Sequence, residues 1–233
     1  MKIAVVTGAN KGIGLAAARG LAQHGFRVFL GARDTVRGQA AATGLQDEGL
    51  AVEWLPIDIA EAASVAEAAR TVAGKVDSVD VLVNNAGVFP DRGVEIAALE
   101  PDELAAKLRA GFDVNVVGSA LTTRAFWELL LKSDDPRVVN VSSGMGQLHD
   151  MGASAPAYSI SKTALNAVTR QFAASSGGKV KVNSICPGWV HTDMGGAGAP
   201  RTPEQGAAII LKLATMADAP TAQFVNDAGE MGW

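Results

Sequence analysis

The stretch "KIAVVTGANKGIG", residues 2–14, decides the fold. An apolar, β-branched run leads directly into a turn that contains Gly8, Gly12 and Gly14. Glycine is needed where the backbone turns at positive φ or approaches a ligand closely. A strand that passes through such a turn into a helix directs free N–H groups and the positive end of the helix dipole at a phosphate. The stretch therefore predicts a nucleotide-binding strand–helix unit.

The rest of the chain repeats this alternation. Strands are predicted over the β-branched runs at residues 2–8, 26–32, 51–58, 79–87, 137–144, 179–188 and 222–226. Helices are predicted over the Ala-rich runs at residues 12–25, 35–48, 61–74, 101–130, from 157 onward and 203–216. Apolar strands that alternate with helices form a parallel sheet covered on both faces. Right-handed crossovers make this a doubly wound, three-layer α/β sheet, the Rossmann fold. With no repeat or composition break, residues 1–233 are expected to form a single domain.

Composition and charge exclude several classes of protein. A net charge of −4 and the absence of any Lys/Arg run give no basic face for a nucleic-acid partner. The first apolar run is too short for a signal peptide or a membrane span, so a cytoplasmic protein with no membrane partner is expected. Cys186 is the single cysteine, which excludes an intrachain disulfide and predicts a buried structural thiol. The three histidines lack metal-ligand spacing, so no metal site is expected.

Four motifs occur in a characteristic order along the chain. They are T-G-x-x-x-G-x-G at 7–14, "NNAG" at 84–87, Y-x-x-x-K at 158–162 and "PGWVHTDM" at 187–194. In this the chain resembles the classical short-chain dehydrogenases/reductases, and its segments 31–50 and 222–233 most resemble the carbonyl reductases that use NADPH. The resemblance implies hydride transfer from NADPH to a ketone, aldehyde or quinone carbonyl of a small molecule. It leaves both a homo-oligomer and a monomer open.

The choice between NAD and NADP(H) rests on the end of the second strand. NAD enzymes of this fold carry an acid there, which accepts a hydrogen bond from the ribose 2′-OH. That place falls on Ala32, which can accept nothing, and Arg33 follows with a guanidinium that matches a phosphate. Lys11 in the glycine turn can reach the same phosphate, so the sequence favours NADP(H). Asp34 is the alternative acid if the strand ends one or two residues later.

The resemblance supplies the remaining cofactor-binding positions. Asp58 matches the family's contact to the adenine amino group, and it can also cap the helix that begins near Glu61. Val190, through its backbone, and Thr192, through its hydroxyl, would lie near the nicotinamide carboxamide. The other positions implied are Asn10, Ile13, Ile59, Asn85, Ala86, Gly87, Pro187 and Gly188, together with Tyr158 and Lys162.

Tyr158 and Lys162 form a candidate proton-transfer pair. Residues four apart share one face of a helix, so both side chains point the same way. A phenol titrates near ~10, and an adjacent ammonium is expected to lower that value. Tyr158 would then give its proton to a carbonyl oxygen as hydride arrives, or remove it in the reverse direction. It is the only tyrosine in the chain, so no other phenol competes for the role.

Two further catalytic positions follow from the resemblance. The family uses a serine upstream of the tyrosine to orient the substrate oxygen, and "NVSSG" offers Ser142 and Ser143 on opposite sides of a strand. Ser143 is the family's match, whereas Ser142 would satisfy neighbouring backbone. Asn115 matches a mid-helix asparagine that holds a water near the lysine; an interhelical hydrogen bond is its other interpretation.

Other functions remain compatible with these residues. An alcohol dehydrogenase working in the oxidative direction would use the same residues. A cofactor-binding regulatory protein without turnover would need only the glycine turn, and the intact set of four catalytic-type residues argues against it. No G-x-S-x-G motif occurs, which disfavours a serine hydrolase.

Overall fold

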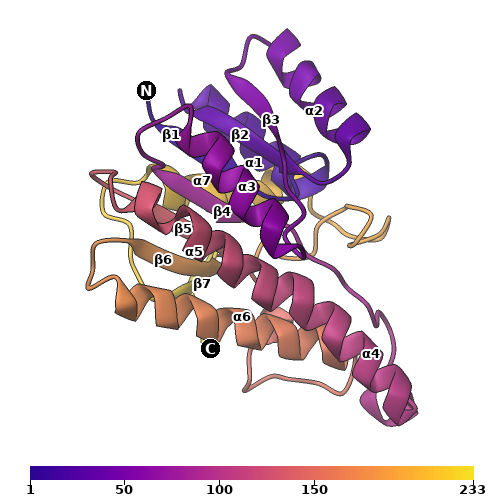
Figure 1. Ribbon diagram of the computed structural model, residues 1–233. Coiled ribbons are helices and arrows are strands. Elements are labelled where there is room, and N and C mark those ends of the chain that lie inside the picture. The colour runs from indigo at the N-terminus through magenta and orange to yellow at the C-terminus, as the bar shows by residue number, and fades with distance from the viewer.

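A single sheet of eight strands forms the centre of the protein, whose computed structural model describes residues 1–233 (Figure 1). The spatial order is β3-β2-β1-β4-β5-β6-β7-β8, and every neighbouring pair is parallel except the antiparallel β7–β8 pair. The strands are β1 (Ile3–Val6), β2 (Arg27–Ala32), β3 (Val52–Pro56), β4 (Val81–Asn84), β5 (Arg137–Val141), β6 (Lys181–Ile185), β7 (Phe224–Asn226) and β8 (Gly229–Glu230). The doubly wound α/β fold is confirmed. β8 was not predicted, because two residues carry no periodicity.

Helices cover both faces of this sheet. They are α1 (Gly12–Gln23), α2 (Thr35–Asp47), α3 (Ala62–Ala73), α4 (Pro101–Phe112), α5 (Ser119–Leu130), α6 (Pro156–Ser175) and α7 (Pro203–Thr215). Side chains of α1, α2 and α7 share one apolar core, and those of α3, α5 and α6 share the other. Figure 1 shows α3, α5 and α6 side by side across one face. Three layers therefore result, as the alternation predicted.

Alternation along the strands fills the two cores. Val5 and Phe29 point into the core under α3 and α5, whereas Val6 and Leu30 point into the core under α1 and α7. All four are fully buried, and each contributes on the order of 1.5–3 kcal/mol through the hydrophobic effect. None of the helices combines the length and apolar composition needed to span a membrane.

The helix predicted over residues 101–130 is continuous but widens to a π-helix at its middle. α4 and α5 are joined without a break by a π-helical segment, Asp113–Gly118, which contains Asn115. Such wide turns are rare and occur often at functional sites. The hydrophobic pattern on either side is helical, so no local pattern marks the extra residue. Here the segment places Asn115 against the loop that follows β4.

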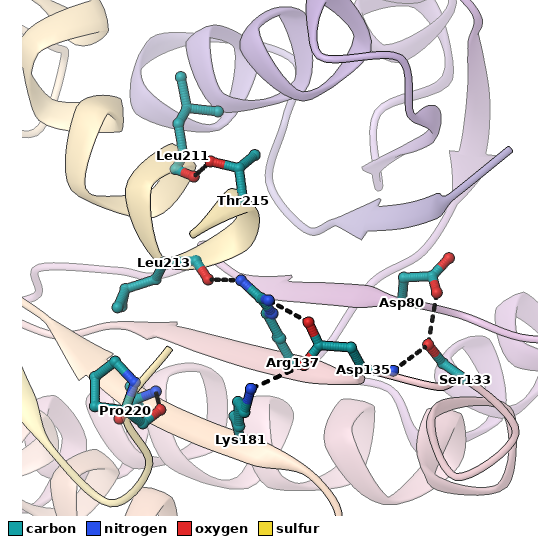
Figure 2. A network of polar contacts seen from close by, with 10 residues as sticks. Asp80, Ser133, Asp135, Arg137, Lys181, Leu211, Leu213, Thr215 and Pro220 are labelled. Carbon is teal, nitrogen blue, oxygen red and sulfur yellow. Dashed lines mark hydrogen bonds and ion pairs between the residues drawn. The ribbon is translucent and has the colours of Figure 1, made fainter. Parts of the chain in front are cut away.

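A polar network holds the amino ends of β4, β5 and β6 together (Figure 2). Arg137, at the start of β5, is buried; it pairs with Asp135 and donates to the Leu213 carbonyl of α7 at 2.7 Å. Asp135 also accepts from Lys181 of β6 at 3.0 Å. Although burial acts in the opposite direction, hydrogen bonds from these two cations hold the pKa of Asp135 below its usual 3.8. These contacts hold the amino ends of the strands together, and the loops at the carboxyl ends form the site.

Candidate active site

A cleft of about 1390 Å³ opens at the carboxyl ends of the strands. Its walls come from the glycine turn after β1 and from the loops after β4, β5 and β6. In a doubly wound sheet this is the edge at which ligands bind. Predicted positions that line it are Lys11, Gly12, Ile13, Gly14, Asn85, Gly87, Ser143, Tyr158, Lys162, Pro187, Gly188, Val190 and Thr192. Predicted positions that lie outside its lining are Gly8, Asn10, Arg33, Asp58, Ile59, Ala86 and Asn115.

The glycine turn has the geometry that a dinucleotide phosphate requires. Gly8 and Gly12 adopt φ of +63° and +55°, and a Cβ at Gly14 would come within 2.5 Å of the Gly8 carbonyl oxygen. Asn85 clamps the turn by donating to the Thr7 and Gly8 carbonyl oxygens at 2.9 and 3.1 Å. No side chain caps the N-terminus of α1, so its first N–H groups are free. The turn therefore fits the diphosphate of a dinucleotide.

The end of β2 fits a 2′-phosphate better than a 2′-hydroxyl. β2 ends at Ala32, so the neutral side chain stands where an NAD enzyme carries its acid. Arg33 follows with a largely exposed guanidinium. The carboxylate of Asp34, the alternative acid, caps α2 by accepting from the Arg37 N–H at 2.9 Å, and this bond is the largest cause of its lowered pKa. The guanidinium of Arg37 also donates a hydrogen bond to Asp34, a contact that no local pattern predicts.

Both cations that are predicted to hold the 2′-phosphate form ion pairs. Lys11 Nζ lies 2.5 Å from the carboxylate of Asp193, which belongs to the loop after β6. Arg33 lies 3.8 Å from Asp58. The carboxylate of Asp58 accepts from the Ala60 N–H at 3.1 Å and does not cap α3, whose N-cap residue is Glu61. The interpretation of Asp58 as a helix cap is therefore wrong, because the chain makes a local turn before the helix begins.

The loop after β6 folds back over the glycine turn. A Cβ at Gly12 would come within 3.0 Å of the Thr192 side chain, so the two segments are in close contact. Val190 is buried against Gly206 of α7. Gly188 turns at φ +76° beside the Arg201 side chain. Positions 188–192 consequently form a wall of the cleft beside the glycine turn.

Tyr158 and Lys162 lie in the first turns of α6, and both are buried. Lys162 Nζ donates to the Val141 carbonyl at 2.8 Å and lies 5.6 Å from the centre of the Tyr158 ring. Burial raises the pKa of Tyr158 to about 12, although hydrogen bonding by Ser143 acts in the opposite direction. Burial also lowers the pKa of Lys162 to about 8. The expected lowering of the Tyr158 pKa by Lys162 is therefore wrong for the free protein, in which desolvation dominates.

The two serines after β5 point to different surroundings. Ser143 lines the cleft, and its hydroxyl accepts from the Met145 N–H at 3.2 Å. Ser142 is buried, and its hydroxyl donates to the Lys162 carbonyl at 3.3 Å. Cys186 also lines the cleft, where its Sγ accepts from the Gly144 N–H at 3.1 Å. It is only half-buried, so the prediction of a buried structural thiol is wrong: β6 ends one residue earlier, and Cys186 begins the loop.

Asn115 fastens the loop after β4 from behind. Its Oδ1 accepts from the Val88 N–H at 2.8 Å, and its Nδ2 donates to the Val88 carbonyl at 3.0 Å and to Ser161 at 2.9 Å. A Cβ at Gly87 would lie 3.1 Å from Asn115 Oδ1 and 3.5 Å from Lys162 Nζ. Asn115 and Lys162 thus border the same glycine. Both amide hydrogens of Asn115 are used by the protein itself.

A family model described as short chain dehydrogenase matches residues 2–202. The chain belongs to the short-chain dehydrogenase family. Carbonyl reductase (NADPH) 1 of Sus scrofa is 33% identical over 281 aligned positions, covering 100% of this chain and 94% of the relative. The Homo sapiens protein of that name is 32% identical, covering 99% and 98%. The family and the likeness to NADPH carbonyl reductases are both confirmed.

Solved structures of this family superimpose on the whole sheet. The NADPH-bound carbonyl reductase from chicken fatty liver has a TM-score of 0.85 at 26% identity, covering 100% of both chains. A putative short chain dehydrogenase from Escherichia coli in complex with NADPH has a TM-score of 0.87 at 27% identity, covering 97% of this chain and 95% of that one. In both, the cofactor named is NADPH, the form that the end of β2 fits here.

Two residues that shape the site of this short-chain dehydrogenase were not predicted from its sequence. Asp91, only 1% exposed, accepts from the N–H groups of Ala157 and Tyr158 at 2.5 and 3.2 Å. It thereby caps α6, whose own N-cap residue, Ala155, has no side chain to do so. The ring of Phe89 stacks on Tyr158, with centroids 4.0 Å apart. Both contacts cross more than 60 residues of sequence, and no local pattern marks them.

Proposed function

We propose that this protein reduces a ketone, aldehyde or quinone of a small molecule to an alcohol, with NADPH as the hydride source and Tyr158 as the proton donor. One observation carries the proposal: Tyr158, Lys162 and Ser143 converge on the cleft that the glycine turn closes at its other end. The relatives named carbonyl reductase (NADPH) 1 support the same chemistry.

The chain offers a binding group for each part of the cofactor. The N–H groups of the glycine turn hold the diphosphate, and Arg33 with Lys11 holds the 2′-phosphate. Asp58 accepts from the adenine amino group. The remaining contacts come from Asn10, Ile13, Ile59, Asn85, Ala86, Gly87, Pro187, Gly188, Val190 and Thr192. NADPH, when bound, supplies the hydride.

The catalytic residues have separate roles in polarising the substrate carbonyl and in transferring the proton. Ser143 donates a hydrogen bond to the carbonyl oxygen and so holds it beside the Tyr158 hydroxyl. Tyr158 keeps its proton at neutral pH, because burial raises its pKa to about 12, and it transfers that proton as the oxygen gains charge. Lys162, whose ammonium lies beside the ring, binds ribose and stabilises the phenolate that results. Asn115 holds the Val88 backbone and supports the path by which Lys162 returns a proton to solvent.

Replacement of Tyr158 tests this assignment. Tyr158→Phe should reduce NADPH consumption with aldehydes, ketones and quinones by about 10²-fold or more. NADPH binding, followed by fluorescence, should change less than twofold, because the glycine turn is untouched. Ser143→Ala should lower kcat in the same substrate panel. A wild-type protein that binds NADPH yet reduces no carbonyl compound would favour a regulatory protein.

We infer that residues 1–233 act as one domain that works in the cytoplasm and requires no nucleic acid, membrane or metal. Both a monomer and a homo-oligomer are compatible with it, since every residue in the catalytic and cofactor-binding set belongs to one chain. Light scattering of the purified protein would measure its mass.

A further inference from the structure

Arg92 is the solvent-exposed cation of the cleft that takes part in no ion pair. Three basic side chains with permanent or titratable ammonium or guanidinium groups line the cleft: Lys11, Arg92 and Lys162. Lys11 is paired with Asp193, and Lys162 is buried and donates to a carbonyl. Arg92 takes part in no ion pair. The neighbouring carboxylate of Asp91 does not reach it in any such pair, because it is turned inward to the N–H groups of α6.

Stacked side chains connect Arg92 with the catalytic tyrosine. The guanidinium carbon lies 5.9 Å from the centre of the Phe89 ring, and that ring stacks on Tyr158 with centroids 4.0 Å apart. Because 5.9 and 4.0 Å add to 9.9 Å, the guanidinium carbon lies no farther than this from the centre of the Tyr158 ring. A molecule whose carbonyl meets Tyr158 therefore needs only modest length to reach Arg92.

The guanidinium connects the loop after β4 with the loop after β6. Its Nη2 donates to the Met194 carbonyl of the opposite loop, and a Cβ at Gly196 would come within 3.3 Å of its Nη1. A guanidinium has five N–H donors, so one bond to a carbonyl leaves others for a ligand. Four large apolar side chains also line the cleft: Phe89, Met145, Trp189 and Met194. The ring of Phe89 lies against the guanidinium, so the positive charge has an apolar side chain beside it.

We propose that Arg92 recognises the carboxylate of an anionic substrate, and that this protein prefers carbonyl compounds that carry a carboxylate at the end remote from the carbonyl. This inference rests on the proposed reductase function. A carboxylate accepts two parallel hydrogen bonds from a guanidinium and is neutralised by it. A phosphate dianion is held best by two cations, and the other two cations that line the cleft are already engaged, Lys11 with Asp193 and Lys162 with the Val141 carbonyl. The apolar side chains would contact the body of the substrate.

Matched substrates test this preference in the NADPH-bound enzyme. We would measure kcat/KM for 4-acetylbenzoate, its methyl ester and 4-acetylphenyl phosphate in the wild type, Arg92→Gln and Arg92→Lys. Arg124→Gln is the matched control, because it removes the same charge from an exposed position on α5. The wild type should prefer the acid to the ester by about 10- to 100-fold, the range expected for hydrogen bonds to a charged group. Arg92→Gln should abolish that ratio through KM, Arg92→Lys should restore part of it, and Arg124→Gln should keep it.

Three results would overturn the inference. They are a wild type without preference for the acid, an unchanged ratio in Arg92→Gln, and an equal loss of the ratio in Arg124→Gln. A preference for the phosphate over the acid would contradict the choice of carboxylate. Calorimetric titration of 4-acetylbenzoate into the NADP⁺ complex separates this inference from the reductase proposal, because it needs no turnover. Binding that Arg92→Gln abolishes would uphold the carboxylate site even if no carbonyl were reduced, whereas equal or absent binding would refute it.

Discussion

The single tyrosine makes the proton donor directly measurable. Tyr158 is the only phenol in the chain, so the alkaline absorbance change of tyrosine reports this residue alone. Burial raises its pKa to about 12 from the usual 10.0, a difference of two units that corresponds to about 3 kcal/mol between the two protonation states. We expect the free folded protein, jumped in pH and read before it unfolds, to titrate near pH 12. The unfolded chain should titrate near 10.

Two variants separate the causes of that shift. Lys162, with a pKa lowered to about 8 by burial, is already neutral where Tyr158 ionises, so Lys162→Met should leave the midpoint nearly unchanged in the free protein. Ser143 lowers the pKa of Tyr158, so Ser143→Ala should move the midpoint upward. Because the folded state holds the proton more tightly, this contribution to stability is present below pH 10 and is lost as the pH rises toward 12. A midpoint at or below pH 10 in the folded free protein would refute the dominance of burial.

Three further expectations follow from individual contacts. Asp91→Ala should lower the free energy of unfolding by about 2–4 kcal/mol, because two buried N–H groups lose their acceptor, and should lower kcat while NADPH binding is kept; urea unfolding and kinetics would check it, with exposed Asp102→Ala as the control. Arg33→Ala should raise KM for NADPH by about tenfold and change KM for NADH little, and equal changes for both cofactors would argue against a 2′-phosphate contact. The lowered pKa of Asp135 implies stability that is present above pH 3.8 and lost as the pH falls through the folded value, so Asp135→Asn should flatten acid unfolding curves in that window.

Local signals were enough to predict the sheet and the nucleotide-binding end of the cleft. The strands are short apolar runs, most with a glycine at or near one end, and each is predicted from five to ten consecutive residues. The glycine turn is equally local, since Gly8, Gly12 and Gly14 lie within seven positions and their backbone angles follow from the turn they make. The absence of an acid at position 32 could be predicted from the end of the second strand alone, and β2 does end at Ala32.

Contacts across the chain were beyond the reach of such patterns. Asp91 is an ordinary acid in a loop until the fold brings it beneath α6, 66 residues later in the chain. The π-helical segment around Asn115 changes the register of a helix without changing its hydrophobic period. Phe89 is relevant to the site only because its ring stacks on Tyr158, and Arg92 only because it lies beside Phe89. A motif therefore predicts which residues react, whereas the packing decides their environment.

The environment of Tyr158 bears on the direction of the reaction. Oxidation of an alcohol requires a phenolate that accepts a proton, and reduction requires a phenol that donates one. In the free protein burial holds the proton on Tyr158 up to about pH 12, and the neighbouring Lys162 also loses charge through burial near pH 8. The protein therefore enters the reaction with its phenol protonated at neutral pH, which is the form that reduction uses. A bound group that brings positive charge or hydrogen-bond donors to the phenol would lower the pKa of Tyr158 toward its ordinary value. The absorbance of the one tyrosine would show that change.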